Sequence, residues 1–172
     1  MRRIMSKIFA SIVVYLTFLI GFIITTIPWD AKFVFLRPYW ILALLLVWTV
    51  KDPRRVGYIT ALVLGVLADS ISGSQLGEHA IAFLIVTFLN RRFIPLYNSI
   101  GYLFQFICVI LFTFVYSIII FVLELFSYNF IKFDLEFFIP ILTTALFWAW
   151  LMTAVSFMQG WLHRKFRIKI GK

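Results

Sequence analysis

Charged residues are scarce in this chain of 172 residues, where they make up only 13% of the sequence. A soluble domain normally carries about 25%, so the composition excludes an ordinary water-soluble fold. Instead, 63% of the residues are hydrophobic and 20% are aromatic, with 21 phenylalanines. We therefore expect an all-α polytopic membrane protein, with helices that face lipid and with residues 1–172 forming a single integral membrane domain.

Residues that carry chemistry are also few. Cys108 is the only cysteine, which excludes an intrachain disulfide and a cysteine-based metal site. His79 and His163 are predicted at opposite membrane faces, and no nucleophile-elbow, P-loop or zinc-protease motif occurs. A triad with Ser70 and Asp69 is disfavoured, because adjacent residues on a helix point in different directions. The sequence predicts no enzyme, no cofactor and no metal site.

Apolar runs predict six transmembrane helices. A bilayer core needs roughly 20 helical residues, and the chain offers apolar segments separated by short polar loops. The expected spans are residues 8–28, 37–50, 56–72, 78–94, 100–124 and 137–162. The second is the shortest and could instead insert only partly. The pair Asp52-Pro53 predicts the start of the third helix, because aspartate is a good N-cap and proline fits the first helical position.

Basic residues outnumber acidic ones by 16 to 7, and their positions orient the predicted helices. They cluster before the first span, between the second and third, between the fourth and fifth, and after the sixth. In a six-helix layout these regions share one face, and basic loops mark the cytoplasmic side. Both termini are therefore expected in the cytoplasm. Because the charges lie in short clusters rather than along one exposed face, nucleic-acid binding is not expected.

A row of small residues follows every fourth position of the third predicted helix, at Gly57, Ala61 and Gly65. Residues four apart share one ridge, and small side chains let another helix approach closely in lipid. The ridge could pack against a helix of the same chain or form a groove for a partner protein. Gly73 and Gly77 continue the spacing, but they are expected beyond the helix end in a tight turn.

Asp69 lies within this row. A carboxylate in a membrane helix is costly and usually faces a partner inside the protein. At 1.5 Å per residue, Asp69 is about 18 Å along the axis from Gly57, which places it towards the outer surface. Arg37 begins the second helix on that side, so we expect an Arg37–Asp69 ion pair. A hydrated Asp69 at the interface is the alternative.

Residues 37–80 combine these features into one pattern. It comprises Arg37-Pro38, Trp48, Pro53-x-Arg55-x-Gly57, Gly65-x-x-x-Asp69-x-x-x-Gly73 and Leu76-Gly77-x-x-Ala80. The pattern resembles the signature of the bacterial rod shape-determining MreD family, although Val47 stands where many members have tyrosine.

The resemblance implies a non-enzymatic scaffold or regulator in the bacterial cytoplasmic (inner) membrane, surrounded by membrane lipids. Proteins of this family bind MreC. Through the complex they act on MreB and on the synthase of RodA and a class B penicillin-binding protein, which makes lateral peptidoglycan. The implied fold is similar to the substrate-binding (S) subunits of energy-coupling-factor transporters. A vitamin-transporter subunit of that fold is therefore the alternative function.

Overall fold

The structure, a computed structural model, is an all-α bundle in which residues 2–97, 101–128 and 138–166 are described. Within those ranges the chain forms six α-helices and one short 3-10 helix. In chain order they are α1 (Arg2–Thr26), η1 (Ala31–Leu36), α2 (Trp40–Lys51), α3 (Tyr58–Ser72), α4 (Glu78–Tyr97), α5 (Tyr102–Tyr128) and α6 (Ile139–Phe166). Each of the six predicted spans overlaps one α-helix, so the expected helical class is confirmed.

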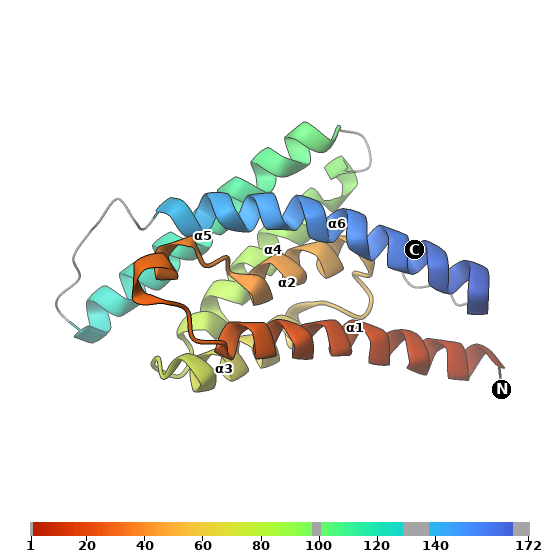
Figure 1. Cartoon of the computed structure of the whole chain (residues 1–172), viewed down its shortest axis with the longest axis horizontal. Helices are drawn as coiled ribbons and strands as arrows, with labels where there is room; N and C mark the ends of the chain where they lie inside the picture. Colours follow the sequence, from red (N-terminus) through yellow and green to blue (C-terminus); the bar gives the residue numbers. More distant parts are fainter. Residues whose placement is uncertain (1, 98–100, 129–137, 167–172) are drawn as a thin grey trace.

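The short helix α2 lies at the centre of the bundle. Every residue from Ile41 to Thr49 is buried, and α1, α4 and α6 pack around it. Figure 1 shows α2 running between α1 and α6. A helix that is apolar on all sides is stable only where neighbours cover every side. Pro38 and Pro53 limit its length, because proline interrupts the backbone hydrogen bonding of a helix.

Within the described residues, four stretches are long and apolar enough to cross a membrane. They are Ile8–Thr26, Lys32–Lys51, Tyr102–Phe126 and Ile139–Leu162. The second predicted span reaches this length only because η1 precedes α2. Helix α3 is apolar but has 15 residues, and α4 carries charged residues at its start and in its second half. These two helices pack together as an antiparallel hairpin beside the four longer stretches.

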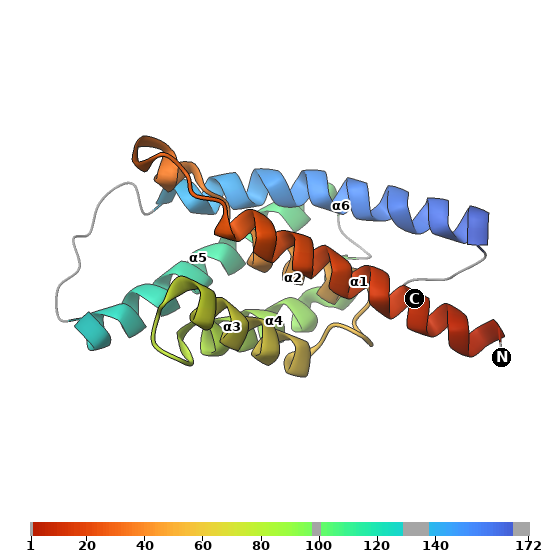
Figure 2. The same ribbon diagram turned by 60° about the horizontal axis from the view of Figure 1, so that its bottom comes forward.

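The bundle has two distinct ends (Figures 1 and 2). The start of α1 and the end of α6 lie together at one end, which we call the terminal end. The opposite end, which we call the η1 end, holds η1, the α3–α4 turn and the start of α6. Neighbouring helices therefore alternate in direction, and side chains from well-separated parts of the sequence meet at each end.

The third helix begins later than its sequence predicts. Helix α3 starts at Tyr58, and residues 52–57 form a turn between α2 and α3. Asp52 is the C-cap of α2, and its backbone N–H donates to the carbonyl of Trp48 at 2.8 Å. The expected N-cap role of Asp52 is thus wrong. Its side chain pairs with Arg55 in the turn, which leaves the carboxylate engaged before α3 begins.

Candidate functional site

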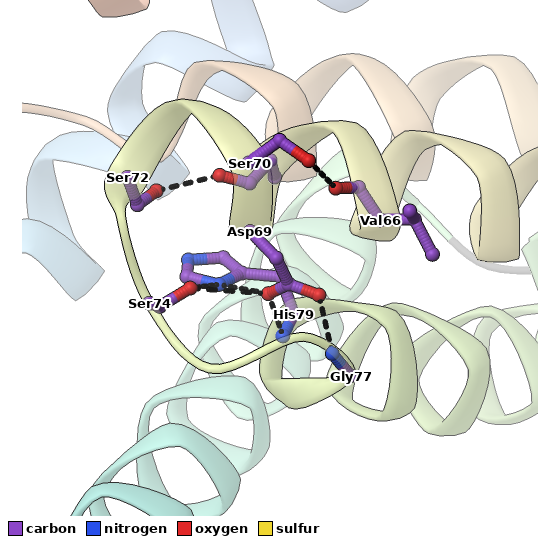
Figure 3. A network of polar contacts seen from close by, with 8 residues as sticks. Val66, Asp69, Ser70, Ser72, Ser74, Gly77 and His79 are labelled. Atoms are coloured by element: carbon purple, nitrogen blue, oxygen red, sulfur yellow. Dashed lines mark hydrogen bonds and ion pairs between the residues drawn. The ribbon is translucent and has the colours of Figure 1, made fainter.

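The Asp69 carboxylate lies at the η1 end, where it joins α3 to the start of α4 (Figure 3). It accepts hydrogen bonds from the backbone N–H groups of Gly77 at 2.8 Å and His79 at 2.7 Å. The Ser74 hydroxyl donates to it at 3.2 Å. The first N–H groups of a helix have no acceptor within that helix. Asp69 therefore caps the following helix, and its negative charge suits the positive helix end.

The imidazole of His79 completes this network. Its Nδ1 lies 2.9 Å from Oδ1 of Asp69. The side chain of Asp69 is fully buried, whereas that of His79 is 17% exposed. A buried carboxylate is strongly unfavourable unless hydrogen bonds replace its lost water. Donors from the α3–α4 turn and from α4 supply that replacement, which explains how an apolar helix tolerates the charge.

The hydroxyl groups around His79 do not form a catalytic relay. Ser74 Oγ lies 3.4 Å from Nδ1 of His79, which is the same nitrogen that faces Asp69. In a Ser–His–Asp relay the hydroxyl and the carboxylate meet opposite ring nitrogens. Ser70 donates instead to the carbonyl of Val66 in its own helix, at 2.9 Å. The geometry of this cluster is that of a helix cap (Figure 3).

The ion pair expected between Arg37 and Asp69 is not formed in the structure. Among the described residues, Asp69 pairs with His79, and no ion pair joins Arg37 to an acidic side chain. The physical reason lies in the α3–α4 turn, which brings donors from residues 74–79 directly onto the carboxylate. Those donors are close in sequence, so they satisfy Asp69 without help from the second helix.

The ridge of small residues on α3 packs against α4 of the same chain. A methyl group added at Gly65 would lie 2.3 Å from Cα of Ala80, so the two backbones approach as closely as only glycine allows. Ala61 is fully buried. A methyl group at Gly57 would lie 2.7 Å from the guanidinium of Arg91. Of the two uses that the sequence leaves open, the structure places this ridge in internal packing.

Basic side chains fasten the turn between α2 and α3 at the terminal end. Arg55 pairs with Asp52 and also donates to the hydroxyl of Ser11 in α1, at 3.2 Å. Arg91 of α4 donates to the carbonyl of Pro53 at 3.0 Å. These bonds connect the turn to two other helices. The family-pattern residues Pro53 and Arg55 therefore lie at a structural junction.

Trp48 links α2 to α1 in the bundle centre. Its side chain is fully buried, and its Nε1 donates to the hydroxyl of Thr17 at 2.8 Å. That hydroxyl donates in turn to the carbonyl of Val14, at 2.6 Å. A buried indole N–H needs such an acceptor. The sequence pattern marks Trp48 without giving it a role, and the structure places it in a hydrogen-bonded contact between helices.

A cavity of about 600 Å³ lies at the η1 end, and we call it the η1 cavity. All six α-helices and η1 contribute to its walls. The walls are mostly apolar, with the aromatic rings of Phe22, Trp40 and Phe83, and they also include Arg37 and His79. Sites for small molecules usually have this size and this mixture of surfaces. The sequence pattern gave no sign of the cavity.

The sequence did not predict the hydrogen bonds of Asp69 to His79 and Ser74. A signal was present, because Gly77 precedes α4 and has no side chain to cap it. The first N–H groups of α4 therefore needed an acceptor from elsewhere, and Asp69 is the acidic residue just before the turn. In the described parts of the chain, no group of three or more His, Cys, Asp or Glu side chains is placed to hold a metal ion.

Fold and site together define a polytopic helical membrane protein whose polar side chains fasten its helices to one another. Residues 5–158 match the family of the rod shape-determining protein MreD, so the chain belongs to that family. Together with its long apolar helices, this membership indicates an inner-membrane protein. The rod shape-determining protein MreD of Haemophilus influenzae is similar, with 31% identity over 104 residues.

That match covers 60% of this chain and 64% of the relative, so the matched region spans just under two thirds of the relative's length. No solved structure matches the chain significantly, and the likeness to transporter S subunits stays a prediction. Family membership supports a role in rod-shape determination and gives no support to a vitamin-transporter subunit.

Proposed function

We propose that this chain is a non-enzymatic scaffold or regulator of the machinery that gives rod-shaped bacteria their form. The observation that carries the proposal is the family match over residues 5–158. The use of its polar groups supports it. Asp69, Trp48 and Arg55 all bond to neighbouring structural elements of the same chain. Hydrogen bonds of this kind hold the helices in fixed relative positions, which suits a membrane scaffold.

The proposed partner is MreC, through which the chain acts on MreB and on the RodA–penicillin-binding protein synthase to influence lateral peptidoglycan synthesis. A partner helix cannot use the small-residue ridge of α3, because α4 covers it. Other faces remain available. Ile12 and Leu19 of α1 are each 56% exposed, and Ile59 and Val63 of α3 are 81% and 51% exposed. We place partner contacts on these outward faces of α1 and of the first half of α3, away from the η1 end.

The proposed topology is one integral membrane domain with six crossings and both termini in the cytoplasm. Two observations support it. The start of α1 and the end of α6 lie at the same end of the bundle (Figure 1), and the basic residues Lys51, Arg55 and Arg91 bond to neighbouring segments there. Positive charge favours the cytoplasmic side. Labelling of cysteines added at the two ends of the chain tests this topology, and labels on opposite membrane sides would refute it.

Depletion in a rod-shaped bacterium tests the function. Loss of the protein should produce rounded cells, and expression of the wild-type chain from a plasmid should restore rods. Cell length and width, together with incorporation of a fluorescent cell-wall precursor along the side wall, provide the measurements. Unchanged shape after complete depletion would contradict the proposal.

Cysteine crosslinking tests the proposed contact with MreC. Cys108 is buried and would first be replaced by alanine. Single cysteines at Ile59 and Val63 should then crosslink to MreC in membranes, whereas a cysteine at the buried Ala61 should not. If MreC co-purifies with the chain but no exposed position on α1 or on the first half of α3 crosslinks to it, these faces are not the interface.

A further inference from the structure

The η1 cavity has an unusual chemical feature in its wall, which is otherwise mostly apolar. Arg37 lies at the junction of η1 and α2, is half-buried, and lines the cavity. Its backbone N–H donates to the carbonyl of Val34 at 3.1 Å. Within the described ranges its guanidinium has no acidic partner. A partly desolvated guanidinium without a counter-charge is unfavourable, so this site favours binding of an anion.

Asp69, the partner that the sequence predicts for Arg37, does not serve as that anion. Asp69 directs its two oxygens at the turn and at the start of α4, where backbone and side-chain donors occupy them. An external oxyanion would therefore neutralise the positive charge of the Arg37 guanidinium. Guanidinium groups bind phosphate with two parallel hydrogen bonds, which gives both strength and orientation.

His79 contributes a second polar side chain to the same wall of the cavity. Its Nδ1 faces Asp69, so its Nε2 lies on the opposite side of the ring. The ring also lines the cavity, with the rings of Phe83 and Tyr116 each 6.2 Å from it between centroids. Arg37 and His79 thus bring polar side chains from two different segments to one cavity.

Four of the residues that line the cavity are exposed, namely Thr26, Val34, Ile71 and Ser72, and two of them are apolar. Val34 of η1 and Ile71 of α3 line the cavity, and they are also 50% and 44% exposed. Phe33, next to Val34, is 53% exposed. In a membrane protein such exposed apolar residues contact lipid. A ligand that enters past them therefore needs an apolar portion of its own.

We propose that the η1 cavity binds a membrane lipid with an anionic phosphate headgroup. The phosphate lies at Arg37, and the acyl chains leave the cavity past Val34 and Ile71. The same phosphate chemistry occurs in soluble phosphate esters, but the exposed apolar side chains of Val34 and Ile71 favour the lipid. This binding site goes beyond the proposed scaffold function and does not depend on it.

Native mass spectrometry of the full chain in detergent tests the proposal. Phosphatidylglycerol is the anionic probe, and phosphatidylcholine of the same chain length is the zwitterionic comparison. Arg37→Gln should lower the apparent affinity for phosphatidylglycerol about tenfold, because it removes a charge-assisted contact. Lys32→Gln is the matched control. Lys32 lies in η1, is exposed and does not line the cavity, so its loss should change the affinity less than about twofold.

A second variant separates the cavity from surface charge. Ile71→Trp leaves every charge in place and enlarges a side chain that lines the cavity, so it should also weaken phosphatidylglycerol binding. Equal losses with Arg37→Gln and Lys32→Gln, or full binding with Ile71→Trp, would overturn the proposal. Equal thermal stabilisation by glycerol phosphate or a vitamin would assign the cavity to a soluble ligand instead. A protein segment crosslinked to a cysteine at Ile71 in intact membranes would also overturn the lipid assignment.

Discussion

Replacing Asp69 with alanine tests the capping network that holds α3 to α4. The change removes the acceptor for the N–H groups of Gly77 and His79 and for the Ser74 hydroxyl. Loss of an N-cap costs about 1 kcal/mol, and a hydrogen bond to a charged group contributes about 1.5–3 kcal/mol. Because these bonds share one carboxylate, their contributions are not additive. We expect Asp69→Ala to lower the free energy of unfolding by about 3 kcal/mol.

The assay is unfolding of the purified chain in mixed detergent micelles, followed by far-ultraviolet circular dichroism. Asp69→Asn keeps one acceptor oxygen and a similar volume, so it should fall between wild type and alanine. Ser70→Ala is the control, because Ser70 is exposed and bonds only to its own helix at Val66. Its effect should stay within about 0.5 kcal/mol. If Asp69→Ala unfolds like Ser70→Ala, the carboxylate does not hold the hairpin together.

The same assay separates the observed network from the ion pair expected from the sequence. In the structure Asp69 bonds to the α3–α4 turn, so exchanging the charges with Arg37 should not restore stability. The double variant Arg37→Asp/Asp69→Arg should be at least as unstable as Asp69→Ala. Recovery to near wild-type stability would show that the two side chains pair in the membrane.

Two further substitutions test helix contacts. Gly65→Ala should lower the free energy of unfolding by about 2 kcal/mol or more, because the added methyl meets the backbone of Ala80. Gly160→Ala in α6 meets no atom within 4 Å, so it should be neutral or stabilising in the same unfolding measurement. Trp48→Phe and Thr17→Ala should each destabilise the chain. A double-mutant cycle should give a coupling of about 1 kcal/mol, and additive losses would contradict the hydrogen bond between them.

Several parts of the fold follow from local sequence. Long apolar runs between short polar loops predicted six helices, and six α-helices are described. The predicted start of the third helix was wrong, because an aspartate can stand at the end of one helix as well as before the start of the next. The side chain of Asp52 pairs with Arg55, three residues later, and does not cap α3. Local composition predicts that a boundary exists, but the side-chain contacts of the turn decide where α3 begins.

The candidate site shows a different limit. The sequence correctly marked a carboxylate that needed a partner inside the protein. It selected Arg37 by charge, whereas the acceptor capacity of Asp69 is used by the backbone of Gly77 and His79. Nearly every residue has a backbone N–H group. The sequence shows that such a group needs an acceptor only where the start of a helix lacks a capping side chain. The charge-based argument therefore overlooked the donors that lie nearest.

The class of this protein was decided in the sequence, because an apolar chain with so few charges is stable in lipid and not in water. The order of its helices and the pattern in residues 37–80 were decided there too. Only the folded bundle determined that α4 covers the small ridge of α3, and that Arg37 and His79 meet at one cavity. Helical periodicity specifies which residues share a face, but the packing of distant segments specifies what that face touches.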